Sequence, residues 1–541
     1  MARPLALAAA IVVSLLAVSG VGGAGAQTPK LGGTVALAAP APREPPCLNV
    51  LISPCKEANL PIRSVLYGAF DFGPDYVRRP RLVSHVDYTT KSPFTLTYHI
   101  RPEAHWSDGT PITAKDFVFT YQARLKYPGT EDDPHKTKVL RVRAVDAKTV
   151  RVVLRSRFFS WREALFDMVL PQHALQGENL EKIWSDRIDN PKTGRPIGSG
   201  PFLVGPWERG KQLTLVRNPS FWGPHRAYLD RVVVRFLPIA FDPDVAELFR
   251  KREADIIDLD FTEELASELR RVPDINLFFP RDAPAWEHLD IRLGPGGHPA
   301  LRDKLVRRAL AYGIDRVAIV RALFGEVGPD LKPLDSAVFR STNRFYQPNW
   351  SIYRYRPAEA RRLLGRARCR RGDDGIYSCA GARLSLRFVA RGAAARRVQT
   401  LELMRAQLKQ AGVEVTPFYV SGRVHEQVLE SGAFDVTLFA WDGPGAEGGG
   451  IKDFYGSGGP RNYMDYRQRL VTADLDQSDR ILDPVQRARV LNRADARLAR
   501  DVPTIPLFEV RSLVAVRSTV RDFVPNHFDW TWHAENWWLD G

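Results

Sequence analysis

The sequence has few cysteines and lacks the motifs that most often carry enzyme chemistry. Only 4 of its 541 residues are cysteine. No glycine-rich loop ends in Lys-Ser or Lys-Thr, the arrangement with which nucleotide-binding enzymes hold phosphates. His425-Glu426 lacks the second histidine of a zinc-protease helix, because Leu429 holds that position. We therefore predict no catalytic residue, no metal and no cofactor, and keep a secreted hydrolase only as an alternative.

The sequence also lacks any apolar run long enough to cross a bilayer. The run at residues 5–18 is shorter than the roughly 20 residues that a membrane-spanning helix needs. Arg3 precedes it, and the small residues 24–26 follow it as a cleavage site typical of secretory signals. We expect residues 1–26 to be a cleaved signal peptide, and the mature chain to be periplasmic or extracellular. A retained membrane anchor is the alternative; no cysteine follows the run directly, so a lipid anchor is not expected.

The four cysteines form two pairs that are local in sequence. Cys47 lies close to Cys55, and Cys369 lies close to Cys379. Neither spacing matches the Cys-x-x-Cys pattern of zinc sites. Four cysteines allow three pairings, and closing a short loop favours the local one. We expect disulfides Cys47–Cys55 and Cys369–Cys379, each stabilising the chain by about 2–3 kcal/mol, as suits an exported protein.

The formal net charge of +15 lacks the clustering that is typical of nucleic-acid binding. Lysine and arginine number 77 against 62 acidic residues, and the arginines are scattered along the chain. We expect no nucleic-acid partner; a polyanion-binding protein is the alternative, which clustered arginines on one face would favour. With 44% apolar and 26% charged residues, the composition is that of a soluble globular protein long enough for two or three compact units.

What the sequence does contain is two blocks rich in turn residues and aromatics. In the first block, residues 197–223, the glycines and proline of residues 198–201 predict a tight turn. Residues 212–217 alternate between apolar and polar side chains, which is typical of a strand with one buried face. The block is therefore predicted to be a β-hairpin that ends in the aromatic pair at residues 221–222.

The second block, residues 105–117, leads into a helix. Thr113 and Asp116 have the spacing of a capping box, in which each side chain accepts a hydrogen bond from the other residue's backbone. The helical repeat predicts that three side chains share the inward face of this helix: Phe117, Tyr121 and Leu125.

Together the two blocks resemble the signatures of the family 5 extracellular solute-binding proteins, the oligopeptide-type receptors of ABC importers. Trp-Ser-Asp-Gly-Thr-Pro at 106–111, Gly-Ser-Gly-Pro-Phe at 198–202 and Leu-Val-Arg-Asn-Pro-Ser-Phe-Trp-Gly at 215–223 occur in the family's order. The resemblance implies an exported receptor that captures a small ligand, an oligopeptide first of all, and delivers it to membrane permease subunits. It also implies a monomer that needs no cofactor and does no chemistry on its ligand.

The resemblance further implies a two-lobed, hinged architecture of the periplasmic-binding-protein type, in the α/β class. Short strands with occasional helices favour an α+β first lobe, residues 27–285 plus 511–541. The second lobe, residues 286–510, is expected to be α/β, because strand, helix and strand follow one another at residues 384–420. The chain would then cross between the lobes twice.

By the same resemblance, ligand contacts lie on the strand that ends at Trp441. In peptide-binding relatives, an aspartate three positions after this tryptophan pairs with the α-ammonium group of the ligand. Here that position is Pro444, whereas Asp442 follows the tryptophan directly. Three hypotheses stay open: Asp442 takes the role, Glu447 takes it, or the protein does not hold a free amino terminus. In the last case the ligand is a nickel complex, a sugar, an opine or haem.

Aromatic side chains are the other candidates for ligand contact. We expect Trp441 at the cleft, with Tyr67, Phe70 and Trp286 as its walls. The alternative for each is core packing, since large aromatic side chains supply much of the apolar area of protein cores. A wall residue would line a cavity between the lobes, whereas a core residue would be enclosed by its own lobe.

Overall fold

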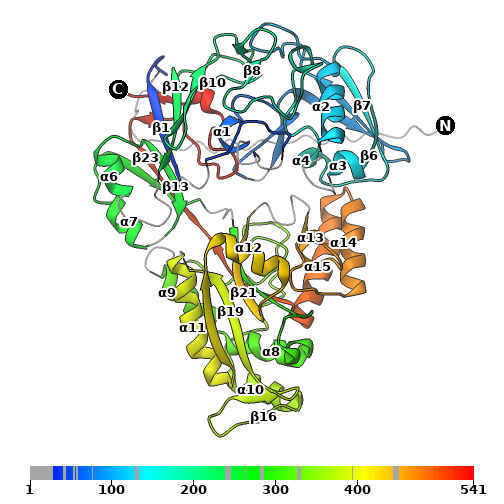
Figure 1. Cartoon of the computed structure of the whole chain (residues 1–541), viewed down its shortest axis with the longest axis vertical. Coiled ribbons are helices and arrows are strands. Elements are labelled where there is room, and N and C mark those ends of the chain that lie inside the picture. The colour runs from blue at the N-terminus through cyan, green and yellow to red at the C-terminus, as the bar shows by residue number, and fades with distance from the viewer. Residues whose placement is uncertain are drawn as a thin grey trace, which may run out of the picture.

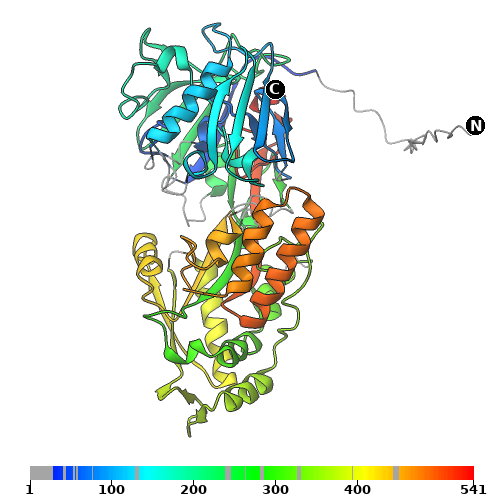
Figure 2. The ribbon, with the colours of Figure 1, turned by 90° about the vertical axis from the view of Figure 1, so that its right-hand side faces the viewer.

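The computed structural model places the chain in two bodies stacked along the long axis of the molecule (Figure 1). A quarter turn of the view keeps the bodies distinct (Figure 2). The structure describes residues 28–40, 44–52, 55, 59–75, 77–127, 133–237, 245–261, 263–280, 285–325, 330–392, 394–442 and 450–541. The predicted signal peptide lies outside these residues. Within them, no helix is both long enough and apolar enough to span a membrane.

The upper body is built on a seven-stranded sheet to which distant parts of the chain contribute. Its strand order is β10-β11-β12-β1-β13-β23-β14. The N-terminal β1 pairs in parallel with β12 and β13, while β23, near the C-terminus, pairs antiparallel with β13 and β14. The strands are β1 (Thr34–Pro40), β10 (Phe202–Glu208), β11 (Gln212–Arg217), β12 (Arg231–Leu237), β13 (Ile256–Asp260), β14 (Ile275–Phe278) and β23 (Ser512–Arg517).

A four-stranded antiparallel sheet of order β4-β5-β7-β6 forms the other side of the upper body (Figure 1). β5 alternates between buried and half-buried side chains, so one of its faces packs on the core and the other lies nearer to solvent. These strands are β4 (Val83–Tyr88), β5 (Phe94–Ile100), β6 (Val139–Ala144) and β7 (Thr149–Leu154). The helices of this body are α1 (Asn59–Ile62), α2 (Ala114–Lys126), α3 (Pro134–Thr137), α4 (Trp161–Ala164), α5 (Gln172–Leu175), α6 (Val245–Arg250) and α7 (Glu263–Leu269).

Helix α2 confirms the predicted capping box and corrects the predicted inward face. The backbone N–H of Thr113 donates to Asp116 Oδ2 over 2.7 Å, and the Thr113 hydroxyl caps the helix start in return. Phe117 is buried as expected, but Leu125 is 41% exposed. Leu125 follows Phe117 by eight residues, which is two full helical turns plus about 80°. Leu125 therefore does not lie on the same face of the helix as Phe117. The smaller Thr120 and Ala123 occupy the buried face instead.

The predicted hairpin is β10–β11, and the Gly-Ser-Gly-Pro turn that precedes it supports a neighbouring segment of the upper body. The backbone N–H groups of Ser199 and Gly200 both donate to the Val65 carbonyl, over 2.9 and 3.0 Å. In return, the backbone N–H of Tyr67 donates to Ser199 Oγ over 2.9 Å. Trp222 Nε1 donates to the Ser199 carbonyl over 2.8 Å. The Gly-Ser-Gly-Pro block therefore fixes the backbone that carries Tyr67.

Replacing Gly200 with alanine is expected to lower the free energy of unfolding by about 1–3 kcal/mol, the usual cost of overpacking. A Cβ atom at this position would stand 2.0 Å from the Ser64 carbonyl oxygen, which belongs to the backbone and cannot rotate away. Gly365→Ala is the control, because no heavy atom lies within 4 Å of its Cβ position and alanine is the better helix former. Denaturant unfolding of both variants checks this; equal stabilities would contradict it.

The lower body is an α/β unit around a five-stranded mixed sheet of order β20-β19-β21-β15-β22. The predicted strand–helix–strand unit is β19, α11 and β20, with the two strands parallel. Its strands are β15 (Ala285–Ile291), β19 (Ser385–Arg391), β20 (Glu414–Val420), β21 (Val436–Asp442) and β22 (Thr504–Val510). The main helices are α8 (Lys304–Gly313), α9 (Arg316–Phe324), α10 (Pro357–Arg366), α11 (Ala395–Ala411), α12 (Gly422–Ser431), α13 (Ile451–Tyr455), α14 (Arg469–Arg480) and α15 (Pro484–Asp501).

Both predicted disulfides are present, one in each body. Cys47–Cys55 closes a loop of the upper body, and Cys369–Cys379 closes a hairpin at the far end of the lower body. All four cysteines are thus paired. This pattern is consistent with export to an oxidising compartment.

Two chain crossings connect the bodies. β22 of the lower sheet and β23 of the upper sheet are separated by Arg511 alone, and β14 leads into β15 through a short connection. Because β14 pairs with β23 and β15 pairs with β22, the two crossings run side by side. Apolar contacts accompany them, since Phe324 packs between Phe261 and Phe508 with ring centroids 6.1 and 5.3 Å apart. This junction has the form of a hinge between the bodies.

Candidate functional site

A cavity of about 260 Å³ lies between the two bodies. Its upper wall comes from the segment before β3 (Arg78–Pro80) and from α4, and its lower wall from a loop of the lower body and the start of α15. The lining residues are Val77, Arg78, Phe159, Ser160, Arg162 and Glu163 above, and Phe339, Phe345, Pro484, Arg487 and Ala488 below. The cavity therefore combines aromatic surface with charged groups of both signs, as ligand pockets commonly do.

The bodies touch directly beside this cavity. The backbone N–H of Phe159 donates to the Asp479 carbonyl over 2.9 Å. The Arg487 guanidinium carbon lies 3.8 Å from the centre of the Phe159 ring, within the range of a cation–π contact. In Figure 1, α14 and α15 lie beneath α3 and α4, on the opposite side of the molecule from α6 and α7. One backbone hydrogen bond and one ring contact can break when the bodies open.

Charged groups of the cavity are partly shielded from water. Arg78 Nη2 lies 3.5 Å from Glu163 Oε1. Burial raises the pKa of the Glu163 carboxyl, against the opposing effect of the Arg78 charge. Burial likewise raises the pKa of Asp479, which Arg487 partly offsets. A ligand that brings its own charge can therefore replace water as the partner of these groups.

Tyr67 and Phe70 lie in a second, narrow pocket inside the upper body. It holds about 20 Å³, enough for a single water molecule, and it also contains Asp71, Arg81 and His533. Phe70 makes an edge contact with Trp161, the residue before Arg162 on the wall of the larger cavity. Phe70 therefore stands behind the wall of the larger cavity, whereas Tyr67 lines the narrow pocket.

The narrow pocket holds a charge network that joins the two ends of the chain. Arg81 Nη2 is 2.6 Å from Glu535 Oε1, and the guanidinium also contacts the Tyr67 hydroxyl. His533 lies between two carboxylates, with Nε2 3.5 Å from Asp71 Oδ2 and Nδ1 3.4 Å from Glu535 Oε1. This network fixes the C-terminal segment against the segment that carries Tyr67.

The pKa values in this pocket differ with the partner that each group finds. Burial lowers the pKa of His533, but its two carboxylate partners outweigh that effect and raise it to about 9. Burial acts to raise the pKa of Glu535, but Arg81 and His533 bring it down to about 2. Asp529 is buried with weaker compensation from Arg63, so its pKa rises to about 6.

In the lower body, Trp441 and Asp442 lie at the end of β21, and Trp286 lies at the start of the neighbouring β15. These strand ends form one edge of the five-stranded sheet. In the strand register Asp442 lies beside Ala285, the first residue of β15, which in turn pairs with Val510, the last residue before the crossing. This edge of the sheet is therefore the one nearest the upper body. Asp442 is exposed there.

Trp441 is enclosed in an aromatic cluster and is only 8% exposed. Its ring stacks on Phe454 at 4.2 Å and lies nearly parallel to Tyr463 at 5.8 Å between centroids. Trp286, opposite Trp441 in the register, is covered by Arg340, whose guanidinium carbon is 3.7 Å from the ring centre. Both tryptophans support the sheet edge from within.

The structure thus brings the predicted residues into two groups, Tyr67 with Phe70 above and Trp286, Trp441 and Asp442 below. Glu447 lies outside the described residues. Sequence reasoning missed Arg78, Glu163 and Arg487, which line the cavity itself. Nothing in the local sequence marks them, because Arg487 is more than three hundred residues away from both Arg78 and Glu163.

The sequence profile of the bacterial extracellular solute-binding proteins, family 5 middle region, matches residues 79–461. The oligopeptide-binding protein OppA of Mycobacterium bovis is 28% identical over 500 residues, covering 88% of this chain and 80% of that protein.

Two solved structures share the fold. The periplasmic EDTA-binding protein EppA has a TM-score of 0.85 at 17% identity, covering 95% of this chain and 97% of its own. The oligopeptide-binding protein AppA of Bacillus subtilis, solved with a nonapeptide, has a TM-score of 0.75 at 19% identity, covering 95% and 100%. At these identities the likeness establishes the two-lobed fold.

Proposed function

Because the chain belongs to family 5 of the bacterial extracellular solute-binding proteins, we propose that it captures an oligopeptide between its two bodies and delivers it to the permease of an ABC importer. The observation that carries this proposal is the cavity of about 260 Å³ lined from both bodies. The name of the mycobacterial relative and the nonapeptide complex of the Bacillus protein support a peptide as the ligand.

Binding proceeds by rotation of the bodies about the paired crossings. The cavity lies slightly below the usual range of about 300–1,000 Å³ for ligand pockets, so a peptide of several residues needs the bodies further apart. Opening breaks the Phe159–Asp479 hydrogen bond and leaves the Phe261–Phe324 contact at the hinge in place. Closure then removes the peptide backbone from water, and its polar groups must find partners in the walls.

We assign the ends of the peptide to charged groups at this interface. Asp442, at the end of β21, and Glu163, in the cavity wall, are the carboxylates that we propose to pair with the α-ammonium group. Glu447 remains a third candidate. Arg78 and Arg487 can pair with a carboxylate. Trp286 and Trp441 hold the sheet edge rigid, and Tyr67 and Phe70 hold the wall that faces it.

We further propose that residues 1–26 are removed on export, that no lipid anchors the chain, and that the protein acts as a monomer. The lobe limits that we propose are residues 27–285 plus 511–541 and residues 286–510, which follow the two crossings. No reaction on the ligand is proposed, because binding and release suffice for a transport receptor.

Native mass spectrometry of the freshly purified protein tests the ligand class. We expect a series of added masses that correspond to peptides, and the same peptides intact after release. A single added mass that corresponds to a metal chelate, an opine or a glycan would show that this compound, and not a peptide, is the ligand. Fragments of an added intact peptide that accumulate over time would indicate a hydrolase and contradict the proposal.

The two carboxylate assignments are separated by titrating one recovered peptide into variants. If a carboxylate pairs with the ammonium group, Asp442→Asn or Glu163→Gln should weaken binding by about 2–5 kcal/mol, while the N-acetylated peptide should bind both wild type and variant weakly. Asp476→Asn is the control, since Asp476 pairs with Lys452 away from the cavity lining. Equal affinities in wild type and both variants would remove these two residues from the site.

A further inference from the structure

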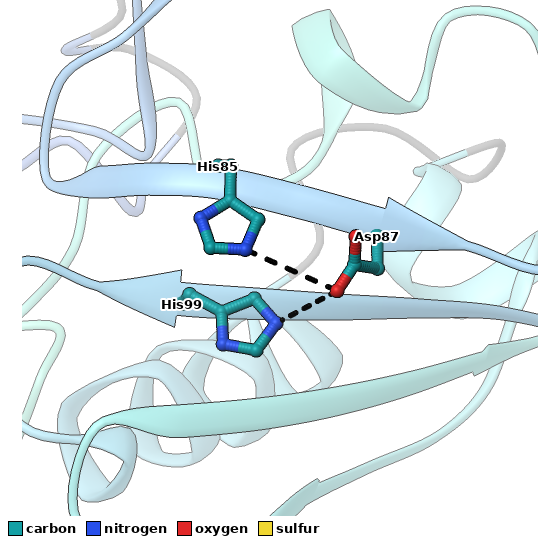
Figure 3. Close-up of side chains that lie close together, drawn as sticks. All are labelled: His85, Asp87 and His99. Atoms are coloured by element: carbon teal, nitrogen blue, oxygen red, sulfur yellow. Dashed lines mark hydrogen bonds and ion pairs between the residues drawn. The ribbon is translucent and has the colours of Figure 1, made fainter.

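The solvent-facing side of the β4–β5 hairpin carries three side chains that converge on one point, His85, Asp87 and His99 (Figure 3). We propose that they form a binding site for a divalent first-row transition-metal ion of the Zn²⁺ type. In the described part of the chain, this is the group in which three ligand atoms of histidine or carboxylate side chains lie within 4.8 Å of one another. It lies apart from the residues that line the cavity between the bodies.

The strand register creates this convergence. His85 pairs directly with His99 across the hairpin, and Asp87 lies two residues further along β4, on the same face. The rings of the two histidines stack with centroids 4.2 Å apart and planes 9° from parallel. His99 Nε2 is 3.0 Å and His85 Nε2 is 3.9 Å from the same oxygen, Asp87 Oδ2. Both imidazoles therefore present Nε2 toward one carboxylate.

The spacing is close to what a tetrahedral ion needs. With bonds of about 2.0–2.1 Å, neighbouring ligand atoms of tetrahedral zinc stand about 3.3 Å apart. The 3.0 Å between His99 Nε2 and Asp87 Oδ2 is already close to this value. His85 Nε2 is 3.9 Å from Asp87 Oδ2 and must come closer to it by roughly half an ångström. All three side chains reach solvent, so small rotations about their side-chain bonds can supply this movement. The fourth position would face water.

A hydrogen bond behind the site favours the tautomer of His85 that metal binding requires. The Ser84 hydroxyl donates to the His99 carbonyl over 3.2 Å, so its oxygen is available as an acceptor. His85 Nδ1 lies 3.0 Å from that oxygen, where it can donate only as Nδ1–H. Nε2 of His85 then carries the lone pair that a metal requires. Outer hydrogen bonds of this kind typically orient metal-ligating histidines.

The ligand set selects the class of ion. Two imidazole nitrogens with one carboxylate oxygen suit Zn²⁺, Cu²⁺ or Ni²⁺, whereas Mg²⁺ and Ca²⁺ prefer oxygen ligands alone. A bound cation would be attracted by the Asp87 carboxylate and by the lone pairs of the two imidazoles. Arg151, which follows Asp87 and Thr97 in the same row of the sheet, and Arg143, which pairs with Arg151, are the basic side chains that work against the ion.

Isothermal titration of ZnCl₂ into the purified full chain tests the proposal. We expect saturable binding with one high-affinity ion per chain. His85→Ala and His99→Ala should each weaken it at least about tenfold, and Ser84→Ala, which leaves all three ligands in place, should weaken it by about tenfold. Unchanged thermal unfolding of these surface variants without metal would show that they are folded.

The matched control is His173→Ala. His173 Nε2 is 2.9 Å from Asp108 Oδ2, so this pair reproduces the histidine–carboxylate contact without a second histidine. We expect zinc affinity to stay at the wild-type value. The proposal is overturned if the wild type shows no saturable binding, or if His85→Ala and His99→Ala bind zinc as tightly as the wild type does.

Discussion

Replacing Arg81 with methionine is expected to lower the free energy of unfolding by about 3–5 kcal/mol, the cost of leaving a buried charge without its partner. Arg81 forms the 2.6 Å ion pair with Glu535, whose side chain is only 5% exposed. Its guanidinium carbon also lies 4.2 Å from the centre of the Tyr67 ring. Methionine keeps much of the apolar contact but leaves Glu535 with a weaker set of partners. Equilibrium denaturation in urea measures the loss.

Arg79→Met is the matched control for this prediction. Arg79 Nη2 is also 2.6 Å from its carboxylate partner, Asp75 Oδ2, but the two side chains are 45% and 48% exposed. Solvent screens such a pair, so the loss should stay below about 1 kcal/mol. The two arginines are two residues apart and differ chiefly in burial. Equal losses in the two variants would show that the Arg81–Glu535 pair does not hold the C-terminal segment.

Replacing His533 with glutamine is expected to remove a contribution to stability that depends on pH. The native state raises the pKa of His533 from 6.5 to about 9, so folding favours the protonated imidazole. The contribution is therefore fully present below pH 6.5 and is lost as the pH rises through 9. At about 1.4 kcal/mol for each pKa unit, it amounts to about 3 kcal/mol at pH 6.

Urea denaturation of wild type and His533→Gln between pH 6 and pH 10 measures this contribution. The difference in unfolding free energy should shrink steadily as the pH rises and should level off near pH 10. His173→Gln is the control, since its partner Asp108 is 36% exposed whereas Asp71 and Glu535 are 14% and 5% exposed, so this pair should contribute less than about 1 kcal/mol throughout. A difference for His533→Gln that does not change with pH would contradict the assigned ion pairs.

These two predictions concern a part of the molecule that the sequence did not reveal. Arg81 and Glu535 are 454 positions apart, and Asn526 donates to the Phe72 carbonyl over a similar separation. Contacts of this kind depend on how the chain returns to the upper body after β22. Hydrophobic periodicity and local motifs contain no information about them.

Local features, by contrast, were predicted well. The capping box of Thr113, the β10–β11 hairpin and the disulfides each depend on residues near one another in sequence. Leu125 was placed on the wrong face because the spacing was followed one turn too far along the helix. For the site, family resemblance offered four aromatic candidates, none of which is among the residues that line the cavity; where each is enclosed could be learned only from the structure.

The cavity explains why the site itself was the hardest part to predict. Arg78 and Glu163 come from the upper body, and Arg487 comes from the lower body. Each is an ordinary charged residue in its own segment. They acquire a common role only because the crossings set α4 above the start of α15. A closing motion would bring these same residues nearer to a bound peptide.

Small-angle X-ray scattering tests most directly whether the two bodies move together around a ligand. The protein is unfolded to strip its ligand, refolded, and measured without and with a saturating amount of a peptide recovered from the purified protein. We predict that the peptide lowers the radius of gyration and that the scattering of the loaded protein matches a closed pair of bodies. Identical scattering curves at saturation would contradict closure.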